Sequence, residues 1–211
     1  MTARDDRLRS VAIEIAKRRP GLVAIVFFAI ASMPLGATER EEPAIHDTIQ
    51  YHDIAGNTEA ELLAALRRVS YADPTGDRFA AANTRWRLRW NLSVQPGKGS
   101  CRLLSATAEL DVEMNLPRWN APDGARPDLV KRWDRFAAAV RKHEDGHRDI
   151  AIDAVREVAD RLHNVTTGRD CAALRKSLGR IAEATVREYR EKEDSYDVTT
   201  MHGRAQGVAF P

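Results

Sequence analysis

Strict alternation of apolar and polar residues predicts an antiparallel pair of strands in the middle of the chain. A period of two sends alternate side chains to opposite faces of a sheet, so each strand has one buried face and one polar face. Residues 95–100, which contain a proline and two glycines, are typical of a hairpin loop that joins two such strands. The expected buried positions are Trp86, Leu88, Trp90, Leu92 and Val94 in the first strand, and Leu104, Ala106, Ala108, Leu110, Val112, Met114 and Leu116 in the second.

The polar face of the first strand carries a row of arginines, Arg85, Arg87 and Arg89. Long basic side chains commonly cover a sheet surface with their stems and keep their charges in water. We therefore expect a solvated outer face here, with an anion-binding surface as the alternative.

Shorter patterns before the hairpin predict one strand and one helix. Residues 48–54 are rich in β-forming types and end at Gly56, which suggests an edge strand. Asn57 is a predicted N-cap for a helix over residues 58–69, and turn residues follow at 73–77. The buried face of that helix would carry Leu62, Leu63 and Leu66.

Two long helices are predicted after the sheet, which we expect to end at Pro117-Arg118-Trp119. Apolar residues at helical spacing predict the first over residues 128–163 and the second over 169–193. The buried face of the second would carry Leu174, Leu178, Ile181, Ala182, Thr185 and Tyr189. The expected fold is a single α+β domain over residues 47–211, with a small, mainly antiparallel sheet, a short helix and two long helices.

An H-E-x-x-H pentad, His143-Glu144-Asp145-Gly146-His147, lies within the first long helix. Residues four apart stack on one face of a helix, so His143 and His147 can present two imidazoles to one metal ion. Glu144 is placed one step round the helix, where it could act as the base for a metal-bound water. The alternatives are a charged, solvated helix face and two core histidines bonded to protein groups. Gly146 costs about 1 kcal/mol relative to alanine in a helix, so we expect something to approach the helix closely there.

The N-terminus predicts an export signal over residues 1–37. A basic run at 17–19 precedes an apolar stretch at 22–35, which is too short to span a bilayer comfortably. We expect cleavage after Ala37, although Leu35 is bulkier than usual at its position, so an uncleaved signal anchor is the alternative. The predicted location is therefore periplasmic or secreted, without membrane attachment after cleavage and with a membrane anchor if the signal is retained.

The exported part has a nearly balanced charge and two cysteines. The whole chain has a formal net charge of +2, and removal of residues 1–37 reduces it to about −1, so no nucleic-acid partner is indicated. Residues 38–46 are charged and contain a proline, which is typical of a tether. In an oxidising compartment Cys101 and Cys171 would pair more often than remain two free thiols.

A catalytic zinc usually has three protein ligands, so a third must come from elsewhere. His163 lies about 24 Å from His147 along the axis of a continuous helix, so it is excluded as the third ligand. We prefer His202, which follows the last predicted helix beside a glycine that could turn its ring inward. The other candidates are His52, Glu183, Glu188 and Glu191.

Supporting roles have several candidates. Asp149 and Asp197 could orient ligand imidazoles as acceptors, although each could also be a simple surface charge. Tyr196, Tyr189 or His202 could stabilise an oxyanion.

Several motifs occur in order along the chain: Tyr51, Gly56 and Thr58; Trp86 and Trp90; Cys101; Leu116-Pro117-Arg118-Trp119; the pentad; and the segment from Tyr196 to Gly203, Tyr-Asp-x-x-Thr-x-His-Gly. Together with an N-terminal signal, this set resembles the DUF922 family, which is described as predicted secreted zinc-dependent proteases of bacteria. The resemblance covers most of residues 47–211. It implies that His143 and His147 are zinc ligands, that Glu144 is the catalytic base and that His202 is the third ligand.

These features predict an exported zinc metallopeptidase with a zincin-like helix and a peptide or protein substrate. Zn²⁺ would lower the pKa of a bound water, and Glu144 would accept its proton. One alternative is a non-catalytic envelope protein that zinc stabilises, and another is a zinc amidase acting on cell-wall peptides. A third is a membrane-anchored scaffold whose pentad is accidental.

Overall fold

The computed structural model describes residues 41–69, 71–72 and 79–210. The predicted signal over residues 1–37 and the predicted turn at 73–77 lie outside these ranges. The elements are β1 (Ala44–Ile54), α1 (Glu59–Arg68), β2 (Tyr71–Ala72), β3 (Phe79–Ala80), β4 (Asn83–Gly97), β5 (Ser100–Trp119), α2 (Pro127–His163), β6 (Thr167–Gly168), α3 (Cys171–Thr200) and a 3-10 turn (Arg204–Gln206). These elements confirm the α+β class. In the described part of the chain, no helix combines the length and apolar character that a membrane span requires.

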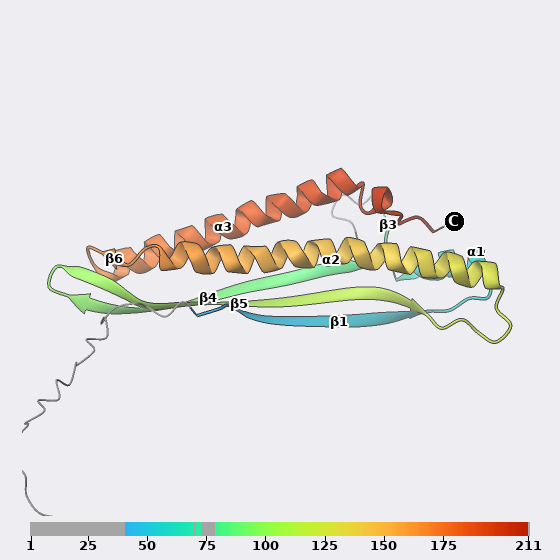
Figure 1. Ribbon diagram of the computed structural model, residues 1–211, viewed down its shortest axis with the longest axis horizontal. Coiled ribbons are helices and arrows are strands. Elements are labelled where there is room, and N and C mark those ends of the chain that lie inside the picture. Colours follow the sequence, from blue (N-terminus) through green and yellow to red (C-terminus); the bar gives the residue numbers. More distant parts are fainter. Residues whose placement is uncertain (1–40, 70, 73–78, 211) are drawn as a thin grey trace, which may run out of the picture. The chain divides into compact units, whose positions relative to one another are not determined.

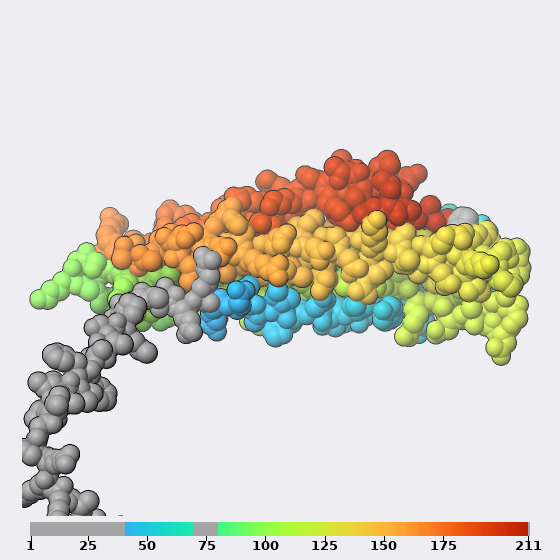
Figure 2. All heavy atoms as spheres, in the orientation of Figure 1, coloured from blue at the N-terminus to red at the C-terminus, as the bar shows by residue number. Residues whose placement is uncertain are grey.

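The main sheet has the order β1-β5-β4, and β6 pairs with the start of β5, at Cys101 and Arg102. The predicted hairpin is present as β4 and β5, which are antiparallel. β1 is parallel to β5, and the short β2 and β3 form a separate antiparallel pair. Both long helices lie on one side of the main sheet, and α2 runs along it (Figure 1). In Figure 2 the strands (blue and green) form one layer and the helices (orange and red) cover it.

Strand β5 ends at Trp119, within the segment where the sheet is predicted to end, and its last residues pair with the end of β1. It departs from the expected pattern near its start. Leu104 is exposed, whereas Leu103 is buried. An irregularity in the pairing between Ser93 and Val94 shifts the register, and such a shift moves the following side chains to the opposite face.

The start of the fold also differs in detail. β1 begins at Ala44, so residues 44–46 belong to a strand rather than to the predicted tether. The N-cap of α1 is Thr58 rather than Asn57. The Thr58 hydroxyl accepts from the amide of Glu61, whose carboxylate accepts from the amide of Asn57 at 2.6 Å. This arrangement resembles a capping box, except that the Glu61 carboxylate bonds the amide of the residue before the N-cap.

The outer face of the sheet is polar and ionic. Arg85, Arg87 and Arg89 are exposed, as the solvated-face interpretation predicts. Arg89 pairs across the hairpin with Glu109 at 3.0 Å and with Asp111 at 2.6 Å. The charge of Arg89 is therefore paired within the sheet itself.

The apolar residues form two clusters, and the H-E-x-x-H pentad lies between them. One cluster joins α1, the first part of α2 up to Val140, and the strand ends at Leu116 and Trp119. The other joins the sheet to α3 and to α2 from Ala151 onward, where Cys101 and Cys171 form a disulfide. These packed regions hold the pentad in place, because α2 is anchored on both sides of it.

Candidate metal centre

Both imidazoles of the pentad converge on one carboxylate oxygen. His143 Nε2 lies 3.2 Å from Asp197 Oδ1, and His147 Nε2 lies 3.1 Å from the same atom. One potential ligand atom from each of the three residues lies within 4.8 Å of the other two. His143 is buried, while the Asp197 side chain is 31% exposed. The group therefore has a protected side on α2 and an accessible side on α3.

Helix α3 supplies Asp197 because it is longer than the sequence pattern indicates. The predicted end was residue 193, but the helix continues to Thr200. Tyr189, Glu193 and Asp197 follow one another at four-residue spacing and so share a face of α3. That face meets the pentad, and it is mostly polar, which is why apolar periodicity did not reveal it.

The remaining nitrogen of each imidazole faces a side-chain oxygen. His143 Nδ1 lies 3.0 Å from Gln206 Oε1, and His147 Nδ1 faces Glu193 Oε1 at 3.6 Å. An acceptor at one ring nitrogen holds the proton there and leaves the other nitrogen free as a ligand. Both rings are therefore oriented with Nε2 toward the shared centre.

Gly146 allows an aromatic ring to close the back of the site. A Cβ at this position would lie 2.1 Å from the hydroxyl of Tyr196, far inside van der Waals contact. The Tyr196 ring stacks on His143 with centroids 5.2 Å apart and 12° between planes. Its hydroxyl donates to the carbonyl of His143 at 3.2 Å and accepts from Gln206 Nε2 at 3.0 Å. The close approach predicted at Gly146 thus comes from a tyrosine of α3.

Glu144 is buried beside the two histidines. Its carboxylate accepts from the hydroxyl of Thr84 on β4 at 2.7 Å. Burial raises the pKa of Glu144, and the Thr84 hydrogen bond and the nearby histidines partly oppose that rise. A carboxylate with a raised pKa is better suited to accept a proton near neutral pH.

In the absence of metal, the histidines and acids of the site form a charged network. Burial works to lower the pKa of His147, but Asp197 and Glu193 outweigh it and raise the pKa to about 10. Burial works in the opposite direction on Asp197, where hydrogen bonds from His143 and His147 prevail and lower the pKa. A proton on His147 therefore supplies the positive charge that a bound cation would supply.

The donor set fits a divalent transition metal. Zinc bonds of about 2.0–2.2 Å in a tetrahedral site place neighbouring ligand atoms roughly 3.3 Å apart. The distances from the two imidazole nitrogens to Asp197 Oδ1, 3.2 and 3.1 Å, are close to that separation. Two histidines and one carboxylate occur at catalytic zinc sites and also at non-haem iron sites. The adjacent buried Glu144 favours hydrolysis, because it supplies a base.

The structure separates the other predicted site residues into near and distant groups. His202 lies next to the centre, with Nδ1 3.8 Å from Asp197 Oδ1 and a side chain that is 43% exposed. It is outside the three-residue group of His143, His147 and Asp197. The Tyr196 ring lies against both imidazoles, and its hydroxyl is bonded to the carbonyl of His143 and to Gln206.

The remaining candidates lie outside the three-residue group. Glu188 pairs with Arg161 at 2.8 Å, and Lys192 lies over the ring of buried Tyr189. Asp149 is 69% exposed beside Arg148. Glu183 and Glu191 are exposed on α3, and His52 neighbours Ala81.

Sequence reasoning missed Thr84, Glu193 and Gln206. Each belongs to a different element, and each meets the pentad only through tertiary packing. Glu193 had a detectable signal, because it precedes Asp197 by four residues and would share its face if the helix continued. Nothing local distinguishes Thr84 or Gln206 from other polar residues.

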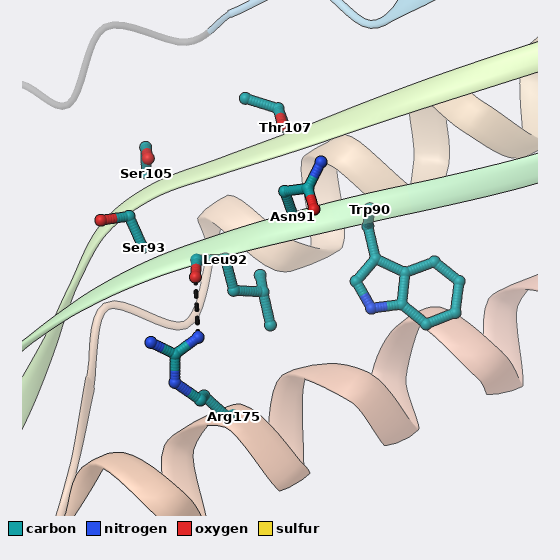
Figure 3. Close-up of a pocket in the computed structure, with 7 residues that line it drawn as sticks. All are labelled: Trp90, Asn91, Leu92, Ser93, Ser105, Thr107 and Arg175. Atoms are coloured by element: carbon teal, nitrogen blue, oxygen red, sulfur yellow. Dashed lines mark hydrogen bonds between the residues drawn. The ribbon is translucent and has the colours of Figure 1, made fainter.

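Two other features do not extend this centre. His46, Glu109 and Asp111 gather on the outer face of the sheet, where both acids are already paired with Arg89. A pocket of about 470 Å³ lies along the hairpin and is lined mainly by uncharged side chains. There Arg175 of α3 reaches the carbonyl of Leu92 at 2.8 Å (Figure 3).

Comparison with known proteins identifies a family but no function. No curated protein and no solved structure matches the chain. Residues 49–203 match DUF922, which is described as a bacterial protein of unknown function. This range covers most of the 211 residues and includes the pentad, Asp197 and His202, so the chain belongs to the DUF922 family.

Proposed function

We propose that this protein is an exported zinc metallopeptidase in which His143, His147 and Asp197 hold the metal and Glu144 is the general base. The observation that carries the proposal is the convergence of both Nε2 atoms on Asp197 Oδ1, at 3.2 and 3.1 Å. The outer nitrogens are already anchored by Gln206 and Glu193, so the rings would need little reorganisation to bind an ion.

Bound zinc would supply a Lewis acid and a water of lowered pKa. Glu144 would accept a proton from the attacking water and return it to the leaving amine of the peptide. Thr84 holds one oxygen of Glu144 at 2.7 Å and thereby fixes the direction of its carboxylate. The substrate would enter on the side of Asp197 and His202, where the two side chains are 31% and 43% exposed.

The location and the substrate class are part of the same proposal. A disulfide between Cys101 and Cys171 supports an oxidising compartment, which agrees with the periplasmic or secreted location predicted from the N-terminus. A peptide or protein is the proposed substrate, and a cell-wall peptide would require the same proton transfers. After signal cleavage the enzyme would act without a membrane anchor.

Metal content provides the first test. Elemental analysis of the purified protein should find about one zinc per chain. The double variant His143→Ala/His147→Ala should lose this zinc and still unfold cooperatively. Absence of zinc, iron and other transition metals from the wild type, even after incubation with zinc, would refute the metal site.

Hydrolysis is tested separately with Glu144→Gln. This variant should retain zinc, because Glu144 is not a proposed ligand, and should lose cleavage of unfolded protein substrates and cell-wall peptides by a factor of about 10² or more. Equal, background-level hydrolysis by zinc-loaded wild type and Glu144→Gln would refute the enzyme and favour a structural metal.

A further inference from the structure

A second site lies beside the metal centre, in a groove of about 710 Å³ between α2 and the C-terminal segment. We call it the basic groove and define it by Arg135, Phe136, Ala139, Lys142, Gln206 and Ala209. Gln206 also accepts from His143 Nδ1, so the groove reaches the back of a proposed ligand. The other end lies against Phe136, where Phe210 closes the aromatic cluster with ring centroids 5.2 Å apart.

The charge of the basic groove is not neutralised within the described structure. Arg132, which also lines it, already pairs with Glu59 at 2.8 Å and with Asp128 at 3.6 Å. Arg135 and Lys142 are exposed, and among the described residues neither has an ion pair. The described lining includes no acidic side chain. Among the described residues, two cations therefore face the same groove without an internal partner.

The spacing and the floor of the groove define its ligand. Arg135 and Lys142 are seven residues apart on α2, which places them about 10 Å apart along the helix axis. In an extended peptide, side chains two to four residues apart are separated by about 7–13 Å. Phe136, Ala139 and Ala209 give the groove an apolar part of its lining. A ligand that matches both features carries carboxylates and apolar side chains on one flexible chain.

We propose that the basic groove binds an acidic segment of a peptide or protein, separately from the metal centre. The apolar floor favours a peptide over a nucleic acid, whose affinity depends on many phosphate contacts, and so does the presence of two unpaired cations, rather than many, in the described lining. Charge complementarity of this kind contributes specificity and association rate. If the proposed peptidase activity is correct, the groove would select substrates with an acidic stretch outside the cleaved bond.

Binding is measured on the full chain carrying Glu144→Gln, so that no probe is cleaved. The probe is a fluorescein-labelled peptide of alternating glutamate and valine, with an alternating lysine and valine peptide as the negative probe. Fluorescence anisotropy at low salt should detect the acidic peptide and not the basic one. Arg135→Glu/Lys142→Glu should weaken binding by about tenfold or more, because repulsion replaces attraction.

Two further variants separate the groove from general charge effects. Ala138→Glu places a carboxylate three residues after Arg135 and four before Lys142, where it can pair with both, so it should also weaken binding by about tenfold. Arg180→Glu/Arg187→Glu on α3 has the same spacing, exposure and change in net charge, and should leave binding unchanged. Melting temperatures of all variants establish that they are folded.

Three results would overturn the proposal: undetectable binding of the acidic peptide, equal loss in the α3 control, or unchanged binding after Arg135→Glu/Lys142→Glu. Tighter binding of a single-stranded oligonucleotide or of anionic lipid vesicles would assign the groove to a different ligand and would also overturn it. None of these outcomes depends on metal content or hydrolysis, so the peptide-binding proposal and the proposed enzyme activity are tested independently.

Discussion

Replacing Gly146 by alanine should destabilise the protein, although alanine is the better helix former. At an unobstructed helix position this change is worth about 0.5–1 kcal/mol in favour of alanine. At Gly146 the new Cβ would lie 2.1 Å from the Tyr196 hydroxyl and 2.3 Å from the ring carbon that bears it. The tyrosine would have to move by roughly 1 Å or more to reach the ordinary contact distance of 3.4 Å.

The cost follows from what Tyr196 would lose. Its hydroxyl makes one hydrogen bond to the carbonyl of His143 and receives one from Gln206, each worth about 1 kcal/mol. Its stacking on the imidazole of His143 contributes about 0.5–1.5 kcal/mol. After the gain in helix propensity is subtracted, a net loss of about 2 kcal/mol remains. For a domain of this size, that loss lowers the melting temperature by roughly 4–8 °C.

The assay compares Gly146→Ala with Gly179→Ala by calorimetry in EDTA, which removes any contribution from bound metal. Gly179 lies within α3, and a Cβ there meets nothing within 4 Å, so its substitution should raise the melting temperature slightly. Zinc titration should also show weaker binding for Gly146→Ala, because Gln206 and His143 lose their common partner. If Gly146→Ala stabilised the protein as much as Gly179→Ala does, the packing argument would be refuted.

Three further predictions concern the same site. Thr84→Val removes the donor to Glu144, so the pKa of Glu144 should rise further. The acidic limb of the pH–rate profile should then shift to higher pH, and an unchanged profile would contradict this. In metal-free protein the pKa of His147 is raised from 6.5 to about 10, so its stabilising effect is complete below pH 6.5 and is lost as the pH rises through 10. The melting temperature in EDTA should therefore fall more steeply between pH 6 and 11 for wild type than for His147→Gln. Parallel curves of melting temperature against pH would contradict a raised pKa of His147. Asp197→Ala should weaken zinc binding by more than the roughly 10–100-fold typical of residues behind a ligand, while His202→Ala should retain one zinc; the reverse order would restore His202 as the third ligand.

Local sequence patterns are sufficient to predict the secondary structure that carries the pentad. Alternation predicted the hairpin of β4 and β5, and helical spacing predicted α2 almost to its ends. The same spacing places His143 and His147 on one face with Glu144 beside them. These features depend only on backbone periods of 2.0 and 3.6 residues, which short stretches of sequence express directly.

The surroundings of those residues depend on tertiary packing. The polar face of α3 beyond residue 193 carries no apolar period, so its helical extension and the position of Asp197 depend on contacts with α2. Likewise, the exposure of Leu104 depends on a shift in strand pairing that its own sequence does not mark. Thr84 and Gln206 reach the pentad from 60 and 63 residues away. Such contacts form only when separate elements pack together, and their energies belong to pairs of residues that no local pattern connects.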